Sequence, residues 1–165
     1  MGVGKSTTGI ALAEKLSYKF LDSDHKIEEL AGMSIPDIFR TYGEKYFRRL
    51  EYEVIRDIAN MSGIVLATGG GAVMNNKLFD ILMSKGTVIH LDASLSTLYD
   101  RLKDSNNRPM LNHNSNRKKR IEDLYMLRRP IYMKAHHTIN TDGKEVRDIV
   151  DEIVEIIMGR EDDKN

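Results

Sequence analysis

The chain has 165 residues, a length typical of one domain with one hydrophobic core. Its 25 Lys and Arg balance its 25 Asp and Glu, so the formal net charge of zero argues against a nucleic-acid partner or an acidic membrane surface. The absence of cysteine excludes disulfides, thiolate metal sites and a cysteine nucleophile, and it suits the reducing cytoplasm.

Short apolar runs alternate with longer helical stretches, which is typical of a βα series with a parallel sheet. In the first half we expect a helix over 5–16, a strand over 18–21, a helix over 24–32, helices within 34–60 that break near Gly43, and a strand over 64–67. In the second half we expect a helix over 77–85, a strand over 87–91, a helix over 94–102, a helical stretch over 117–136 broken at Pro130, a strand over 138–140, a helix over 145–158, and fraying over 159–165.

Two features complete this organisation. Residues 103–116 are polar and rich in Asn and Ser, so we interpret them as a mobile loop. No apolar run approaches the ~20 residues of a membrane-spanning helix, and Lys5 and Ser6 interrupt any apolar leader. The pattern predicts a single cytoplasmic α/β domain over 1–165, with helices flanking a central parallel sheet.

A glycine-rich segment, Gly2-Val3-Gly4-Lys5-Ser6-Thr7, directly precedes the first expected helix. It supplies the second half of the pattern GxxxxGK(S/T), in which backbone N–H groups surround phosphate oxygens, the lysine reaches the β- and γ-phosphates and the hydroxyl binds Mg²⁺. On that pattern, the first glycine and the strand before it would precede Met1. We therefore expect the chain to begin inside its phosphate loop and to lack the first strand. Taken alone, the segment would be an ordinary glycine-containing helix start.

The same residues fit a rival interpretation, because Met1-Gly2-Val3-Gly4-Lys5-Ser6 matches the MGxxx(S/T) pattern of N-myristoylation. A single myristoyl chain anchors weakly, and no polybasic patch follows to add a second signal. We therefore favour the phosphate loop and expect no membrane partner. An in-frame apolar strand encoded upstream of Met1 would make the lipidation match accidental.

Two carboxylates follow the first expected strand, in Asp22-Ser23-Asp24. Residues two apart on an extended strand point the same way, so we expect both to face the phosphate site at the carboxyl edge of the sheet. One can support Mg²⁺ while the other accepts a proton from an attacking hydroxyl group. A turn or a helix cap is the alternative for an isolated Asp-Ser-Asp.

Candidates for anion binding follow in the middle of the chain. Arg48 and Glu51 share a helix face, so the carboxylate can orient the guanidinium toward a planar anion. Gly69-Gly70-Gly71 follows a buried strand, where glycines expose N–H groups and let a ligand approach closely. Arg108 in the expected lid and Arg128 beyond it bring further charge to the site. The ordinary alternatives are an exposed ion pair and a flexible turn.

The motifs in chain order are MGVGKST, FLDSD, the SIPDIF helix, the GEKYFRRLE helix, LATGGGAV, the RP-bearing lid and the RRPIY helix. As an ordered set they resemble the shikimate kinase family of nucleoside-monophosphate-kinase-like P-loop enzymes, over nearly the whole chain. The resemblance implies a three-layer P-loop kinase fold with a mobile lid over about 103–116 and substrate-binding helices over about 24–60. It implies an enzyme that phosphorylates the 3-hydroxyl of shikimate with ATP and Mg²⁺, in the biosynthesis of chorismate and aromatic amino acids. We expect a monomer.

The resemblance also implies roles for individual residues. For ATP it implies Gly2, Val3, Gly4, Lys5, Ser6 and Thr7, with Arg101 flanking the adenine and Arg108 reaching the phosphates. For Mg²⁺ it implies Ser6 and, through water, Asp22. For shikimate it implies Arg48 and Arg128 on the carboxylate, with Gly69, Gly70 and Gly71 beside them, Asp24 acting as base on the hydroxyl, and Glu51 orienting Arg48. Asp24, Lys5 and Arg108 form the expected catalytic set, and over 141–144 the match assigns no residue.

Two other functions use the same residues. Another small-molecule kinase of this fold, such as a gluconate or nucleotide kinase, is distinguished by the arginine pair Arg48 and Arg128. The non-enzyme alternative is a truncated remnant that is unable to use ATP and only binds shikimate. Its motivation is the absent first strand, because losing a central strand leaves unpaired backbone groups and a hole in the core.

Overall fold

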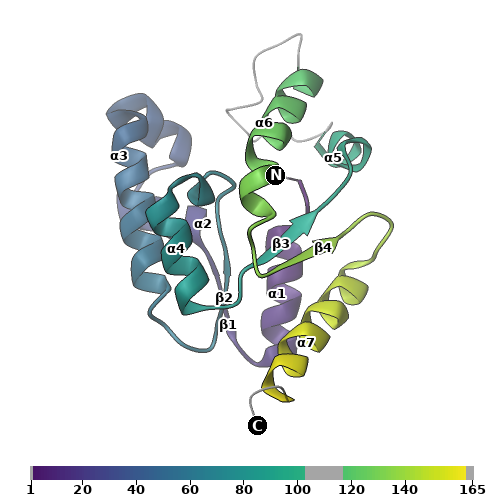
Figure 1. Ribbon diagram of the computed structural model, residues 1–165. Helices are drawn as coiled ribbons and strands as arrows, with labels where there is room; N and C mark the ends of the chain where they lie inside the picture. The colour runs from purple at the N-terminus through teal and green to yellow at the C-terminus, as the bar shows by residue number, and fades with distance from the viewer. Residues whose placement is uncertain (1, 103–116, 163–165) are drawn as a thin grey trace.

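The computed structural model describes residues 2–102 and 117–162, so the expected lid and its Arg108 lie outside the described residues. Helices and parallel strands alternate along the chain (Figure 1). The helices are α1 (Lys5–Leu16), α2 (Ser23–Ala31), α3 (Ile35–Ile58), α4 (Asn76–Lys85), α5 (Leu95–Leu102), α6 (Arg117–Tyr132) and α7 (Val146–Asp162). The strands are β1 (Lys19–Asp22), β2 (Ile64–Ala67), β3 (Ile89–Asp92) and β4 (His137–Asn140), and a short 3₁₀ helix, η1 (Ala72–Met74), follows β2.

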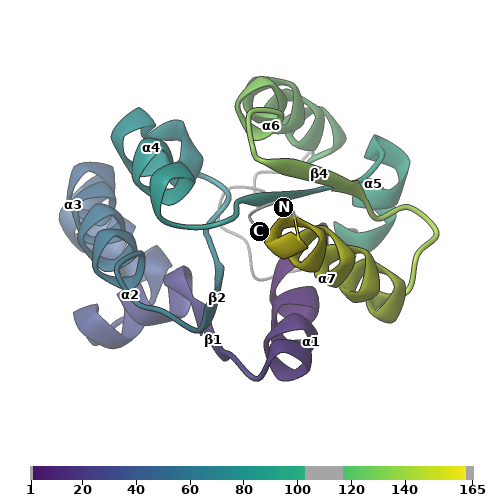
Figure 2. The same cartoon turned by 60° about the horizontal axis from the view of Figure 1, so that its bottom comes forward.

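Helices cover the strands from two sides, as Figure 2 shows. The pair α1 and α7 pack together on one side, and α1 also contacts β1 and β2. On the other side lie α4 and α6, while α2 and α3 pack against each other beyond β1. This arrangement confirms the predicted three-layer α/β fold. No helix in the described ranges is both long and apolar enough to cross a bilayer.

The strands form two separate parallel pairs. In one, β1 pairs with β2 and Asp22 lies opposite Ala67; in the other, β3 pairs with β4 and Asp92 lies opposite Asn140. A cavity of about 530 Å³ is bordered by both β2 and β3, and Leu12 of α1 is among its apolar lining side chains. Within the described ranges, the predicted parallel sheet therefore consists of two separate two-stranded sheets.

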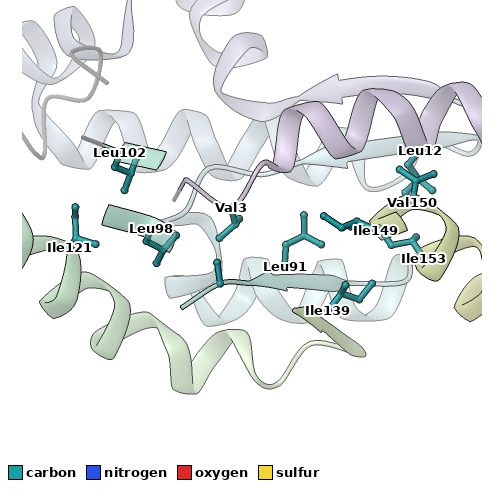
Figure 3. Close-up of a cluster of buried hydrophobic side chains, with 11 residues drawn as sticks. Val3, Leu12, Leu91, Leu98, Leu102, Ile121, Ile139, Ile149, Val150 and Ile153 are labelled. Carbon is teal, nitrogen blue, oxygen red and sulfur yellow. The ribbon is translucent and has the colours of Figure 1, made fainter. Parts of the chain in front are cut away.

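The largest buried cluster joins β3 and β4 to α1, α5, α6 and α7 (Figure 3). Its members are Val3, Leu12, Leu91, Ala93, Leu98, Leu102, Ile121, Ile139, Ile149, Val150 and Ile153. Val3 belongs to the glycine-rich segment rather than to a helix or strand, and burying its side chain contributes about 1.5 kcal/mol. The core therefore anchors the start of the chain beside α1.

Two helix ends differ from the sequence predictions, and one predicted helix break is confirmed. Pro130 lies inside α6, which ends at Tyr132 instead of breaking at the proline. The proline lacks the N–H that would bond the carbonyl four residues back, but helical bonding continues beyond it, since the backbone N–H of Met133 donates to the Arg129 carbonyl at 2.9 Å. The closing helix α7 continues past Gly159 to Asp162, where we expected fraying; one glycine costs a helix only about 1 kcal/mol. The expected break at Gly43 is confirmed, since its φ of 78° and ψ of 174° are not helical.

Candidate functional site

The glycine-rich segment turns sharply into α1. Gly2 and Gly4 both have positive φ angles, 74° and 85°, which glycine adopts without strain. Gly4 is the N-terminal cap of α1, and no side chain caps that end of the helix. A β-carbon on Gly2 would lie 2.9 Å from Leu102 Cγ, so the loop also packs tightly against the end of α5. The first-turn N–H groups of α1 are thus placed to bind an anion, with Lys5 at the helix start.

Asp22 links this segment to the end of β1. Its Oδ2 accepts a hydrogen bond of 3.0 Å from Ser6 Oγ. Its Oδ1 accepts the backbone N–H groups of Asp24 at 2.9 Å and His25 at 3.4 Å, and so caps α2. A hydroxyl and a carboxylate oxygen side by side are ligands that suit Mg²⁺, which usually takes only one or two protein carboxylates. Ser6 and Asp22 therefore fit the predicted metal position.

The expected geometry of the two aspartates is wrong in one respect. Asp22 ends β1, but α2 begins at Ser23, so Asp24 lies in the first turn of a helix and not on an extended strand. The cap that Asp22 provides explains why the helix starts so early. The two carboxylates consequently face different neighbours: Asp22 contacts Ser6, whereas Asp24 faces Gly69 after β2.

Gly69 brings two carboxylates and a hydroxyl together at the end of β2. A β-carbon at this position would lie 2.6 Å from Asp24 Oδ1 and 3.4 Å from Glu51 Oε1. Its backbone N–H donates to Ser23 Oγ at 3.0 Å, although Ser23 is 46 residues away in sequence. A β-carbon here would displace the Asp24 carboxylate, and Ser23 is a contact that the sequence patterns did not identify.

Glu51 is a buried carboxylate, with only 2% of the residue exposed. It accepts a hydrogen bond of 2.7 Å from Arg48 Nη1, while the more exposed Glu44 accepts from Arg48 Nε and Nη2 at 3.3 and 3.2 Å. Burial raises the pKa of the Glu51 carboxyl, and the Arg48 guanidinium opposes that rise. Burial also lowers the pKa of Arg48, but the two glutamates outweigh it and leave that pKa raised. Arg48 therefore stays charged and is held in one orientation from both sides.

The two arginines reach neighbouring glycines. A β-carbon on Gly70 would lie 2.9 Å from Arg128 Nη1, and one on Gly71 would lie 2.9 Å from Arg48 Nη1. Arg128 is 9% exposed, although it carries a charge. The predicted pair of guanidinium groups is thus brought to one glycine-lined place from two helices, α3 and α6. Two such groups suit a planar carboxylate.

Arg101 lies apart from these residues. Its Nη1 and Nη2 donate to the side-chain oxygen and the carbonyl oxygen of Thr141, both at 3.2 Å. Thr141 is fully buried directly after β4. Arg101 therefore joins α5 to the 141–144 segment, which the sequence could not assign. The contact spans 40 residues, and position after a parallel strand is the signal that would have singled out Thr141.

One family matches nearly all of the chain: the sequence model described as shikimate kinase covers residues 1–158. The shikimate kinase of Sulfurihydrogenibium is 44% identical over 160 residues, which are 97% of this chain and 95% of that protein. The shikimate kinase of Geobacter sulfurreducens is 45% identical over 157 residues, which are 95% of this chain and 86% of that protein.

Solved structures show the same likeness. The shikimate kinase from Acinetobacter baumannii in complex with shikimate has a TM-score of 0.91 and 38% identity, covering 97% of this chain and 89% of that chain. The crystal structure of shikimate kinase from Aquifex aeolicus has a TM-score of 0.84 and 36% identity, covering 97% of this chain and 93% of that chain. The fold described above is thus that of known P-loop kinases.

Proposed function

This chain belongs to the shikimate kinase family, whose members phosphorylate shikimate with ATP in the biosynthesis of aromatic amino acids. From this premise we propose which of its residues bind each substrate and which take part in the phosphoryl transfer. An ATP site lies at the N-terminal end of α1, and a shikimate site lies beside the glycines that follow β2. The convergence of Arg48 and Arg128 on Gly71 and Gly70 is the observation that carries this division. The residues and the metal named below are our assignment.

The shikimate carboxylate binds between Arg48 and Arg128. Both side chains present guanidinium nitrogens at the glycine backbone, since a β-carbon on Gly71 would lie 2.9 Å from Arg48 Nη1 and one on Gly70 would lie 2.9 Å from Arg128 Nη1. Glu51 and Glu44 hold Arg48 from the other side, so less rotational freedom is lost when the substrate binds. Gly69, Gly70 and Gly71 let the ring of the substrate approach the backbone closely.

Asp24 accepts the proton of the shikimate 3-hydroxyl. Its carboxylate reaches Gly69 from the first turn of α2, while the arginines reach Gly70 and Gly71, so the carboxylate and the arginines can act on different parts of one small molecule. As the hydroxyl oxygen forms its bond to the γ-phosphorus, the bond from that phosphorus to the β,γ-bridging oxygen breaks. ADP leaves, and the hydroxyl proton passes to Asp24.

The phosphates of ATP bind at Gly2-Val3-Gly4-Lys5-Ser6-Thr7. First-turn N–H groups and the Lys5 ammonium neutralise the transferred group, and positioning with charge stabilisation supplies most of the catalysis. Ser6 and Asp22 would hold Mg²⁺, which would neutralise further phosphate charge. Arg101, tied to Thr141, would flank the adenine. Arg108 would reach the phosphates from the 103–116 segment, which lies outside the described residues.

The arginine pair supplies the test. Replacing Arg48 or Arg128 by alanine should raise the KM for shikimate at least about 30-fold and the KM for ATP less than about 2-fold, since each change removes a charged hydrogen bond to one substrate only. Arg40→Ala is the control, because that side chain is exposed and pairs with its helix neighbour Asp37. An unchanged KM for shikimate in either variant would contradict the assignment. None of the relatives supports a remnant that only binds shikimate.

We also propose that residues 1–165 act as one monomeric domain, whose cavity between β2 and β3 accepts a further parallel strand. The cavity is lined by Val65 and Leu66 on one side and Ile89 and Leu91 on the other, so an apolar strand would bury its side chains there. It would also join the two strand pairs into one sheet.

Extending the chain at Met1 tests this proposal. An extension of five Val and Ile residues followed by a glycine and one further residue should raise the melting temperature by at least about 10 °C, which corresponds to about 3 kcal/mol for a protein of this size. A matched extension of Ser and Gly should not. Equal melting temperatures for the two extended chains would contradict the strand, and gel filtration would show whether either chain is a monomer.

A further inference from the structure

Tyr132 connects three parts of the site from the last turn of α6. Its hydroxyl donates a hydrogen bond of 2.6 Å to the carbonyl oxygen of Gly70, 62 residues earlier in the sequence. Its ring lies against His90 of β3, with 4.9 Å between the ring centroids. It follows Arg128 by four residues, so the two side chains share one face of the helix. The tyrosine therefore ties α6 to β3 and to the glycines after β2.

The Tyr132 hydroxyl and the Arg128 guanidinium crowd the same glycine. A β-carbon on Gly70 would lie 3.4 Å from Tyr132 Oη and 2.9 Å from Arg128 Nη1. Burial raises the pKa of Tyr132, against the lowering effect of the charge and hydrogen bond of Arg128. The hydroxyl consequently keeps its proton and donates a hydrogen bond to the Gly70 carbonyl. The Arg128 guanidinium therefore lies against the Gly70 backbone, and the hydrogen bond from Tyr132 holds that backbone in place.

We propose that Tyr132 is a positioning residue for the shikimate carboxylate, because its hydroxyl fixes the Gly70 backbone beside Arg128. This inference rests on the proposed function of Arg128 and Gly70. Without the hydroxyl, the Gly70 peptide can rotate away from the guanidinium, and the substrate must order both groups when it binds. The cost falls on shikimate affinity and not on the phosphoryl-transfer step, which takes place at Asp24 and the phosphate loop.

Tyr132→Phe isolates the hydroxyl, since phenylalanine keeps the ring that packs against His90. Calorimetric titration of the ATP-free protein with shikimate should show a dissociation constant raised at least about 5-fold, because the change removes the hydrogen bond to the Gly70 carbonyl and the one with Arg128. In steady state the KM for shikimate should rise by the same factor, with kcat and the KM for ATP changed less than about 2-fold. Tyr125→Phe is the matched control on α6, where that ring lies beside Arg129.

The outcomes separate this inference from the function on which it rests. A shikimate dissociation constant within about 2-fold of that of the unaltered protein would overturn the role of Tyr132 while leaving the proposed site intact. A lower melting temperature with unchanged shikimate affinity would overturn it too, because it would make the hydroxyl purely structural. Failure of the unaltered protein to bind shikimate would overturn the proposed function and this inference together.

Discussion

Replacing Glu51 by glutamine tests how the site holds Arg48. The substitution keeps the size and shape of the side chain but removes its charge. Arg48 stays charged, so the contact remains a hydrogen bond to a charged group, but it loses the attraction between opposite charges, and we expect the 2.7 Å contact with Arg48 Nη1 to weaken by about 1–2 kcal/mol. If the same free energy is lost from shikimate binding, the KM for shikimate rises about 5- to 30-fold.

The assay is steady-state ADP release with shikimate varied at saturating ATP. Glu44→Gln is the control, because this glutamate also bonds Arg48 but its side chain is 67% exposed, and exposed pairs contribute about 0–1 kcal/mol. We expect Glu44→Gln to raise the KM for shikimate less than about 3-fold. An unchanged KM in Glu51→Gln, or equal effects of the two substitutions, would refute the argument that burial makes the Arg48–Glu51 pair the stronger one.

The same variant has a pH signature. Because the pKa of Glu51 in the folded protein is raised above its ordinary value of 4.5, the folded state binds more protons than the unfolded state between those two values. The free energy of unfolding contributed by this group therefore falls as pH rises through that interval. Urea unfolding at several pH values should show Glu51→Gln gaining stability relative to the unaltered protein across it. Parallel pH profiles for the two proteins would contradict the raised pKa.

Two further substitutions probe the shikimate site. Asp24→Asn should lower kcat by about 10²- to 10⁴-fold, the usual contribution of a general base, while calorimetry still detects shikimate binding; near-normal turnover would remove Asp24 from the catalytic role. Gly70→Ala should raise the KM for shikimate more than about 10-fold, because its β-carbon would lie 2.9 Å from Arg128 Nη1, whereas Gly86→Ala, with no atom within 4 Å of the new carbon, should leave the KM unchanged. Equal KM values for these two alanine variants would show that the close approach at Gly70 does not matter to binding.

Much of the site could be predicted from local sequence because its residues come from compact motifs. Lys5, Ser6 and Asp22 lie at the ends of expected elements, and the structure does bring Ser6 and Asp22 together. Arg48 and Glu51 are three residues apart on one helix, so their ion pair follows from helix geometry alone.

Contacts between distant segments could not be predicted in this way. Ser23 bonds Gly69 across 46 residues, Tyr132 bonds Gly70 across 62, and Arg101 bonds Thr141 across 40. No periodicity marks these partners, since each depends on how strands and helices are packed. The Asp22 cap shows a second reason: a side chain that can end a strand can also start a helix, and the sequence alone did not decide between them.

The most direct test of the central claim is a coupled ADP-release assay on the chain with ATP and Mg²⁺, with and without shikimate. We predict that shikimate accelerates ADP release strongly and that one shikimate 3-phosphate appears for each ADP. Gluconate and nucleoside monophosphates should give no such acceleration. A rate that is independent of shikimate, or faster with one of those other acceptors, would contradict the account.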